Sequence, residues 1–204
     1  MDEILNETRE NRGGIMERIN QALGPNRKPT RIFSAAVLLL ILAGISYAVM
    51  TDNFHAITPG EAYRSAQLDP KDLEYYIKKY GIKSVLNLRG PNPSAPWYKK
   101  EIKACQKNKI MHFDVSLSAT SEPAARDVRQ LMQIFQYAPR PILFHCKAGA
   151  DRSGLVAAMW KVVVDKEPKS QAQKELSIFY GHVPLRGTEV MDRFFRDWEP
   201  QSLN

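Results

Sequence analysis

The sequence predicts an α/β domain with a mainly parallel central sheet flanked by helices, preceded by one transmembrane helix. The domain is predicted because short apolar, β-like runs alternate with helical patterns from residue 54 onward, and such alternation places helices on both faces of a parallel sheet. The transmembrane helix is predicted by an uninterrupted apolar run at residues 32–50. We therefore divide the chain into a short polar segment at 1–31, a membrane span at 32–50 and a domain at 52–204.

The apolar run is long enough to cross a bilayer. Its nineteen residues carry no charge, and at ~1.5 Å per residue they reach ~28 Å, close to the ~30 Å hydrocarbon thickness. Residues 46–48 also fit a signal-peptidase site, but the charged segment before the run is longer than a usual secretory n-region, so we expect an uncleaved anchor. Arg27, Lys28 and Arg31 precede the run, and positive residues stay in the cytoplasm. The domain is therefore expected outside the cytoplasm, in the periplasm if the source is bacterial.

The elements of the domain are predicted in order from turn signals and periodicity. Residues 57–65 are predicted to form a turn and a short strand. Asp69 is the predicted N-cap of a helix with Pro70 at its first position, and this helix should end at Tyr80 before Gly81. The later strands are predicted at 82–88, 110–115 and 142–144, and the later helices at 97–107, 122–137, 155–164, 170–180 and 187–198.

A glycine-containing loop joins the strand that ends at Phe144 to the helical pattern at 155–164. Backbone N–H groups of such a loop turn inward at the helix N-terminus and form an anion-binding nest. Five residues separate Cys146 from Arg152, so the sulfur should lie below a bound phosphorus, with the guanidinium fork against two of its oxygens. The amide dipoles and the guanidinium favour the thiolate, which is a nucleophile at neutral pH. The expected phosphate-binding residues are Lys147, Ala148, Gly149, Ala150, Asp151, Arg152 and Ser153.

Four further residues are predicted to act around this loop. Ser153 is expected to donate a hydrogen bond to the cysteine sulfur as it leaves a phosphocysteine, and His145 is expected to brace the loop from behind. Arg89, at the end of the strand predicted at 82–88, is expected either to reach the substrate or to brace the loop. Cys105 could cap the reactive cysteine reversibly if the two sulfurs came within bridging distance.

The string HCKAGADRSG resembles the active-site loop of the cysteine-dependent protein tyrosine phosphatase superfamily, whose signature is His-Cys, five residues, Arg, and Ser or Thr. The coinciding residues are His145, Cys146, Gly149, Arg152, Ser153 and Gly154. The domain as a whole is similar to the small dual-specificity branch, which includes bacterial members with an N-terminal membrane segment. This resemblance implies hydrolysis through a phosphocysteine intermediate, with neither a metal nor a cofactor.

The superfamily usually supplies a general acid from a separate loop. Loops at the carboxyl ends of parallel strands should converge on one cleft, and residues 116–123 occupy the position of the acid loop. The only carboxyl side chain in that segment is Glu122, which is therefore the predicted acid, although its surroundings are also typical of a helix start. Asp114 and Asp151 are the second and third candidates.

The expected activity is phosphomonoester hydrolysis, with phosphotyrosine or phosphoserine/threonine in a protein as the preferred substrate. Lys147, directly after the nucleophile, resembles the phosphoinositide phosphatases of the same superfamily, so a phosphorylated lipid or inositol headgroup is the alternative, although Asp151 should repel a polyanion. A catalytically inactive phosphoprotein-binding module is the third interpretation. The net charge of +7 suits an anionic partner or a membrane surface, whereas the sequence has no aromatic-interleaved basic stripe for nucleic acid.

Overall fold

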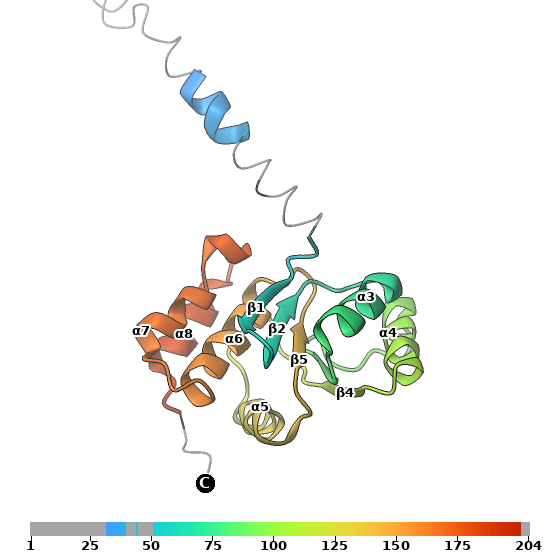
Figure 1. The fold of residues 1–204 in the computed structure, drawn as a ribbon. Helices are drawn as coiled ribbons and strands as arrows, with labels where there is room; N and C mark the ends of the chain where they lie inside the picture. The colour runs from blue at the N-terminus through green and yellow to red at the C-terminus, as the bar shows by residue number, and fades with distance from the viewer. Residues whose placement is uncertain (1–31, 40–43, 45–50, 201–204) are drawn as a thin grey trace, which may run out of the picture. The chain divides into compact units, whose positions relative to one another are not determined.

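The computed structural model describes residues 32–39, 44 and 51–200 (Figure 1). The chain divides into two units, Met1–Ile45 and Ser46–Asn204. In the first unit, residues 32–39 form a helix with exposed side chains. The polar segment predicted at 1–31 lies outside the described residues, as do residues 40–43 and 45–50 of the predicted membrane span. Among the residues that the structure describes, no helix is both long enough and apolar enough to cross a membrane.

The second unit is built on a five-stranded sheet with the strand order β1-β2-β5-β3-β4. The strands are β1 (His55–Thr58), β2 (Ala62–Ser65), β3 (Ser84–Asn87), β4 (Met111–Asp114) and β5 (Ile142–His145). All neighbouring pairs are parallel except β1 and β2. The predicted mainly parallel sheet is thus confirmed, and the strand before the glycine-containing loop lies at its centre. The turn and short strand predicted at 57–65 correspond to the turn before β2 and to β2 itself, whereas β1, which pairs antiparallel with β2, was not predicted.

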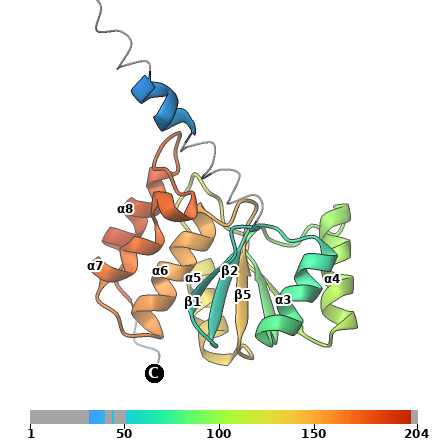
Figure 2. The same ribbon diagram turned by 45° about the horizontal axis from the view of Figure 1, so that its top comes forward.

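Helices cover both faces of the sheet (Figures 1 and 2). The helices α3 (Pro70–Tyr80) and α4 (Pro96–Lys107) lie on one face, while α5 (Ala125–Tyr137), α6 (Asp151–Val163) and α8 (Glu189–Asp197) lie on the other. Successive side chains of a strand point to opposite faces, so Leu143 joins the core beside α3 and α4, whereas Phe144 joins the core beside α5 and α6. The near-continuous apolar runs in the sequence reflect this burial on both sides.

The helix predicted from Asp69 to Tyr80 has the predicted ends. The Asp69 side chain accepts hydrogen bonds from the N–H groups of Lys71 and Asp72, which satisfies two of the free donors at the helix start. Gly81 has a φ of 64° and closes the helix in the left-handed conformation that glycine tolerates best. Residues next to the helix determine both of its ends, so this helix could be predicted from the sequence alone.

The prediction of a continuous helix at 170–180 was wrong. The structure has only a short α7 (Lys169–Ala172), followed by the 3-10 turns η1 (Gln173–Glu175) and η2 (Ile178–Tyr180). The carbonyl oxygen of Glu175 accepts a hydrogen bond from Arg64 on β2 at 2.8 Å, so a tertiary contact takes an acceptor that a continuous helix needs. Smaller differences concern the other helix starts, because α5 begins at Ala125 after Pro123, and α6 begins at Asp151, inside the predicted phosphate loop.

Candidate active site

The loops that follow β3, β4 and β5 converge, as expected at the carboxyl ends of parallel strands. The N–H group of Leu88 donates to the carbonyl oxygen of His145 at 2.9 Å. Arg89 and Ser116 form an isolated antiparallel bridge between the next two loops. Arg152 donates from Nη1 to the carbonyl oxygen of Leu117 at 3.3 Å. The segment predicted to carry the acid therefore borders the loop predicted to bind phosphate.

Arg64 on β2 holds one side of the phosphate loop. Its side chain is fully buried, and Nη2 donates to the carbonyl oxygens of Gly149 and Ala150, both at 2.9 Å. Its Nη1 donates to the carboxylate of Glu175 at 2.9 Å, which neutralises the buried guanidinium, and its face lies over the ring of Tyr180 at 4.5 Å. The sequence analysis missed Arg64. An arginine within a predicted strand whose other residues are suited to the core could have indicated it.

Two more residues from outside the loop bind its remaining carbonyl groups. Asn53 donates from Nδ2 to the carbonyl oxygen of Ala148 at 3.0 Å, and the N–H group of Gln67 donates to that of Lys147 at 3.2 Å. The carbonyl groups of residues 147–150 are therefore all held from outside the loop. In a trans peptide, the C=O of one residue and the N–H of the next point in opposite directions, so the N–H groups of 148–151 are directed to the inside. An anion nest requires N–H groups oriented in this way. Residues distant in sequence thus orient this loop, while anion binding by it stays a prediction.

Gly149 shows why the loop needs glycine at this position. Its φ is 71°, and a Cβ atom there would lie 2.6 Å from the backbone nitrogen of Ala66 and 2.6 Å from the carbonyl carbon of Ser65. Both contacts are to backbone atoms at the end of β2, which cannot yield as a flexible side chain would. The loop therefore packs directly on the neighbouring strand, and a side chain at residue 149 would push it away.

The two residues predicted to perform the chemistry lie at opposite ends of this loop. Cys146 is 2% exposed and follows β5 directly. Arg152 is partly buried, its Nε is buried without a hydrogen-bond partner in residues 51–200, and it forms no ion pair with a described carboxylate. Ser153 is buried, and its hydroxyl has no partner among the described residues either, so its predicted role at the sulfur stays a prediction.

His145 is braced from behind by Glu101 of α4. Nε2 of His145 lies 3.2 Å from one carboxylate oxygen of Glu101, and Nε2 of His112 lies 2.8 Å from the other. Gln67 also donates to this carboxylate at 2.5 Å. Burial of Glu101 opposes its ionisation, but the nearby histidines and these hydrogen bonds outweigh it and hold its pKa well below the usual range. The sequence analysis missed this buried carboxylate, and the role of His145 as a brace of the loop stays a prediction.

The structure places two of the candidate acids in different surroundings. The Glu122 side chain is 53% exposed, and its carboxylate accepts one hydrogen bond, from Nε of Arg193 at 3.3 Å. Asp114, at the end of β4, accepts hydrogen bonds from Asn87 at 2.7 Å and from the Tyr98 hydroxyl at 2.6 Å. Asp114 therefore belongs to a polar network with Asn87 and Tyr98.

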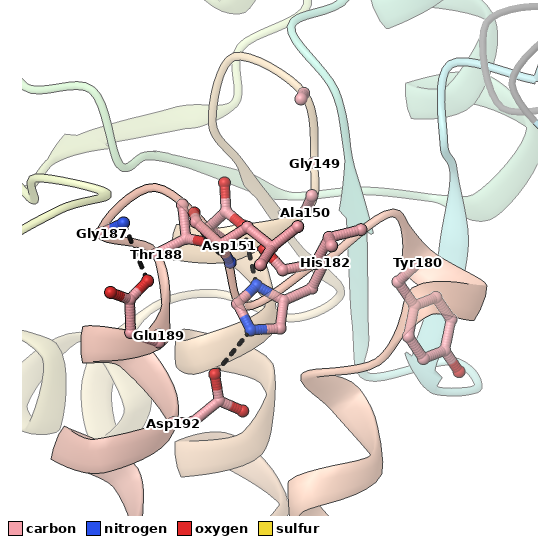
Figure 3. Close-up of polar contacts among 12 residues, drawn as sticks. Gly149, Ala150, Asp151, Tyr180, His182, Gly187, Thr188, Glu189 and Asp192 are labelled. Carbon is pink, nitrogen blue, oxygen red and sulfur yellow. Dashed lines mark hydrogen bonds and ion pairs between the residues drawn. The ribbon is translucent and has the colours of Figure 1, made fainter. Parts of the chain in front are cut away.

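The third candidate, Asp151, belongs to a cluster that ties the phosphate loop to α8 (Figure 3). Nδ1 of His182 lies 2.7 Å from Asp151, and Nε2 of His182 lies 2.8 Å from Asp192. Burial lowers the pKa of His182, but the hydrogen bonds and charges of the two carboxylates outweigh burial and raise it. This cluster was not predicted from the sequence, because its members come from three separate segments.

Arg89, in the loop after β3, is connected to the loop after β5 through Gln67, whose N–H group donates to the carbonyl oxygen of Lys147. The Arg89 guanidinium lies 3.7 Å from the ring centre of Trp97 and donates from Nη1 to the side-chain oxygen of Gln67 at 3.0 Å. Burial, together with the positive charge of Arg152, lowers the pKa of Arg89. The positively charged guanidinium groups of Arg89 and Arg152 therefore repel each other.

Cys105 lies away from this loop. It is buried and unpaired in the core beside α3 and α4, whereas Cys146 belongs to the core on the other face of the sheet. Burial, followed by the charge of Glu101, raises the pKa of the Cys105 thiol to about 12. Cys105 is therefore an unreactive core residue, and the capping disulfide is not formed. Within the described part of the chain, no group of three acidic, histidine or cysteine side chains is placed to hold a metal ion.

Comparisons with known proteins agree with this geometry. A family model described as DSP-PTPase phosphatase fused to NAD+ kinase matches residues 52–191, and no curated protein matches the chain. The fold is similar to the core catalytic domain of the PP-IP phosphatase Siw14 from S. cerevisiae, with a TM-score of 0.60, 19% identity, and coverage of 72% of this chain and 85% of that one. TpbA from P. aeruginosa has a TM-score of 0.56 and 21% identity, with coverage of 73% of this chain and 86% of that one. PTPMT1 in complex with PI(5)P has a TM-score of 0.52 and 17% identity, with coverage of 72% of this chain and 96% of that one.

Proposed function

The chain belongs to the DSP-PTPase family of cysteine-dependent phosphatases, and from this premise we propose that it hydrolyses phosphomonoesters through a phosphocysteine formed on Cys146. One observation carries the proposal. The carbonyl groups of residues 147–150 are fixed from outside the loop, so the inward N–H groups are free to receive phosphate oxygens, together with Arg152, which has no carboxylate partner among the described residues. Donors that need no reorganisation are the main source of stabilisation for a charged transition state.

The proposed reaction has two steps. The Cys146 thiolate attacks phosphorus, an S–P bond forms, and the P–O bond to the leaving group breaks as the leaving oxygen takes a proton from a general acid. Arg152 and the loop N–H groups bind the three equatorial oxygens. Water then gives a proton to the carboxylate left by the acid and attacks phosphorus, an O–P bond forms, the S–P bond breaks with the electron pair going to the Cys146 thiolate, and phosphate leaves. The buried hydroxyl of Ser153 donates a hydrogen bond to the sulfur in this second step.

We keep Glu122 as the proposed acid. Its carboxylate is held by one long hydrogen bond to an exposed arginine, whereas Asp114 and Asp151 are each held by bonds of 2.7 Å or less. A carboxyl group that must move to a leaving oxygen and release a proton needs the weaker restraint. Catalytic hydrogen bonds are often long or absent without substrate, so the surface position of Glu122 does not oppose the role.

The proposal is tested by phosphate release from the purified full chain under reductant. Aryl phosphate, phosphotyrosine peptide and phosphoserine peptide serve as substrates, and Cys146→Ser is the control variant. We expect turnover that disappears in the variant. Binding of phosphate ligands without any turnover by the natural chain would instead support the inactive binding module.

The preferred substrate class is a phosphorylated protein, and a phosphorylated lipid or inositol headgroup is the second candidate. Similar folds are described with both kinds of ligand, since TpbA was solved with phosphotyrosine and PTPMT1 with PI(5)P. The observation that favours the second candidate here is Arg89, a further guanidinium beside the phosphate loop.

We also propose that residues 32–50 anchor the chain in a membrane, with the phosphatase domain outside the cytoplasm. The support is the uncharged apolar run and the basic residues before it. In a bacterial host, external protease should digest the domain in spheroplasts but not in intact cells. Protection of the domain in spheroplasts would refute the proposed orientation.

A further inference from the structure

Exposed apolar side chains gather in one short segment that follows η1. Single apolar residues scattered over a surface are normal, whereas a cluster of them marks an interaction surface. In residues 51–200, the exposed large apolar side chains outside this segment lie far apart in sequence, at Tyr75, Met111 and Tyr137. Four others fall within residues 178–185, namely Ile178, Phe179, Val183 and Leu185, with exposed fractions of 72%, 88%, 42% and 65%. We call these four side chains the 178–185 patch.

The backbone that carries the patch is fixed. His182, in the middle of the segment, is 1% exposed and lies between the carboxylates of Asp151 and Asp192 (Figure 3). The Thr188 hydroxyl donates to the carbonyl oxygen of Val183 at 2.7 Å. The apolar side chains are therefore held on the surface by an ordered backbone, and a partner that covers them would not first have to order the segment.

The segment is also bound to the residues that follow the apolar run at 32–50. Nδ2 of Asn53 donates to the carbonyl oxygen of Tyr180 at 2.9 Å, and the His55 ring packs edge-on against the Tyr180 ring at 4.9 Å. Asn53 comes three residues after Met50, the last residue of the run, and three residues of chain span at most about 11 Å. If residues 32–50 cross a bilayer, Tyr180 and the neighbouring Phe179 must therefore lie close to its surface.

The exposed charges of the same segment are positive. Between residues 174 and 186, Lys174 and Arg186 are exposed, and the single carboxylate is that of Glu175, which is buried against Arg64. Basic residues beside an apolar surface are attracted to anionic lipid headgroups. A second copy of the chain fits less well, because a two-fold interface would bring the same positive residues together.

We propose that the 178–185 patch enters the headgroup region of the membrane in which residues 32–50 are anchored, with anionic lipid as its partner. This inference goes beyond the proposed phosphatase activity and rests on the proposed anchor. The second attachment restricts rotation of the domain about the short connection at residues 51 and 52. It also sets the height of the phosphate loop above the bilayer, because Asn53 donates to the carbonyl oxygens of both Tyr180 and Ala148, at 2.9 and 3.0 Å.

The test places one fluorescent probe on the patch of the full chain in vesicles. Phe179→Cys is labelled in a chain that also carries Cys146→Ser, while the buried Cys105 should stay unlabelled. The vesicles contain phosphatidylcholine, phosphatidylglycerol and a lipid with a nitroxide quencher on its acyl chain near the headgroup. Tyr137→Cys in the same background is the matched control, because Tyr137 is 74% exposed and ends α5 before β5 begins, whereas the phosphate loop follows the other end of β5.

Lipid quenching at residue 179 should exceed that at residue 137 by about threefold or more, because interfacial apolar groups lie ~5–10 Å into the headgroup and acyl boundary. Adding Leu185→Ser, which removes apolar contact, or Arg186→Gln, which removes charge, should weaken the quenching at 179, as should vesicles without phosphatidylglycerol. Equal quenching at the two positions would overturn the inference. So would shielding of residue 179 from aqueous iodide without lipid quenching, which would indicate a second copy as the occupant.

Alkaline carbonate extraction of the same vesicles tests the anchor separately. A chain that stays in the vesicles but shows no lipid quenching at residue 179 would overturn the proposed contact of the patch and leave the anchor standing. A chain that is quenched at residue 179 but released by carbonate would support the contact of the patch and refute the anchor.

Discussion

Replacing His182 with glutamine should destabilise the domain in a pH-dependent manner. His182 is 1% exposed and lies between the carboxylates of Asp151 and Asp192, at 2.7 and 2.8 Å (Figure 3). It joins the start of α6, and with it the phosphate loop, to α8. Glutamine keeps an uncharged donor of similar reach but removes the charge that both carboxylates bind.

The size of the effect follows from these two contacts. A hydrogen bond to a charged group contributes about 1.5–3 kcal/mol, and each carboxylate here is about a quarter exposed, at 24% and 25%, which weakens the interaction. We therefore expect a loss of about 2–4 kcal/mol when His182 is charged. Because folding raises the pKa of His182 above its ordinary 6.5, this stabilisation is fully present below that value and is lost as pH rises through the folded-state pKa.

The assay is urea unfolding of the full chain in mild detergent, followed by tryptophan fluorescence, to which the buried Trp160 contributes. The difference in unfolding free energy between the natural chain and His182→Gln should be larger at about pH 5.5 than at about pH 9. His55→Gln is the matched control, because burial and then Arg64 lower the pKa of His55, which reverses the sign. A difference for His182→Gln that is constant, or that grows with pH, would refute the reasoning.

Three further predictions concern other parts of the site. Gly149→Ala should abolish phosphatase activity and lower the melting temperature, because its Cβ would meet backbone at 2.6 Å; normal activity would disprove this packing. Glu101→Gln should lower the free energy of unfolding by about 3–5 kcal/mol at neutral pH, as expected when one partner of a buried pair is removed. Folding lowers the pKa of Glu101, so urea titrations should show that this loss becomes smaller as pH falls through the acidic range. Glu122→Gln should reduce kcat on a phenyl phosphate with a poor leaving group and remove the basic limb of its pH profile, while sparing a good leaving group; an unchanged profile would reassign the acid to Asp114 or Asp151.

The parts that the sequence predicted well are those specified by neighbouring residues. The helix from Pro70 to Tyr80 was identified because Asp69 caps it and Gly81 ends it. The parallel sheet was identified because alternating elements leave few other arrangements. The phosphate loop was identified because Cys146 and Arg152 belong to one short turn between a strand and a helix. In each case the determining contacts span only a few residues.

Contacts between segments far apart in the chain became known only from the tertiary structure. Arg64 reaches the loop after β5 across 85 residues, and it also binds Glu175 in the segment where a continuous helix was expected at 170–180. Asn53 reaches Ala148 across 95 residues. The sequence alone was enough to predict a phosphate-binding loop after β5, but the groups that orient its carbonyl oxygens, and the His182 cluster beside it, depend on packing of the whole sheet. Local patterns carry no information about such contacts, because they form only when distant strands and helices are brought together.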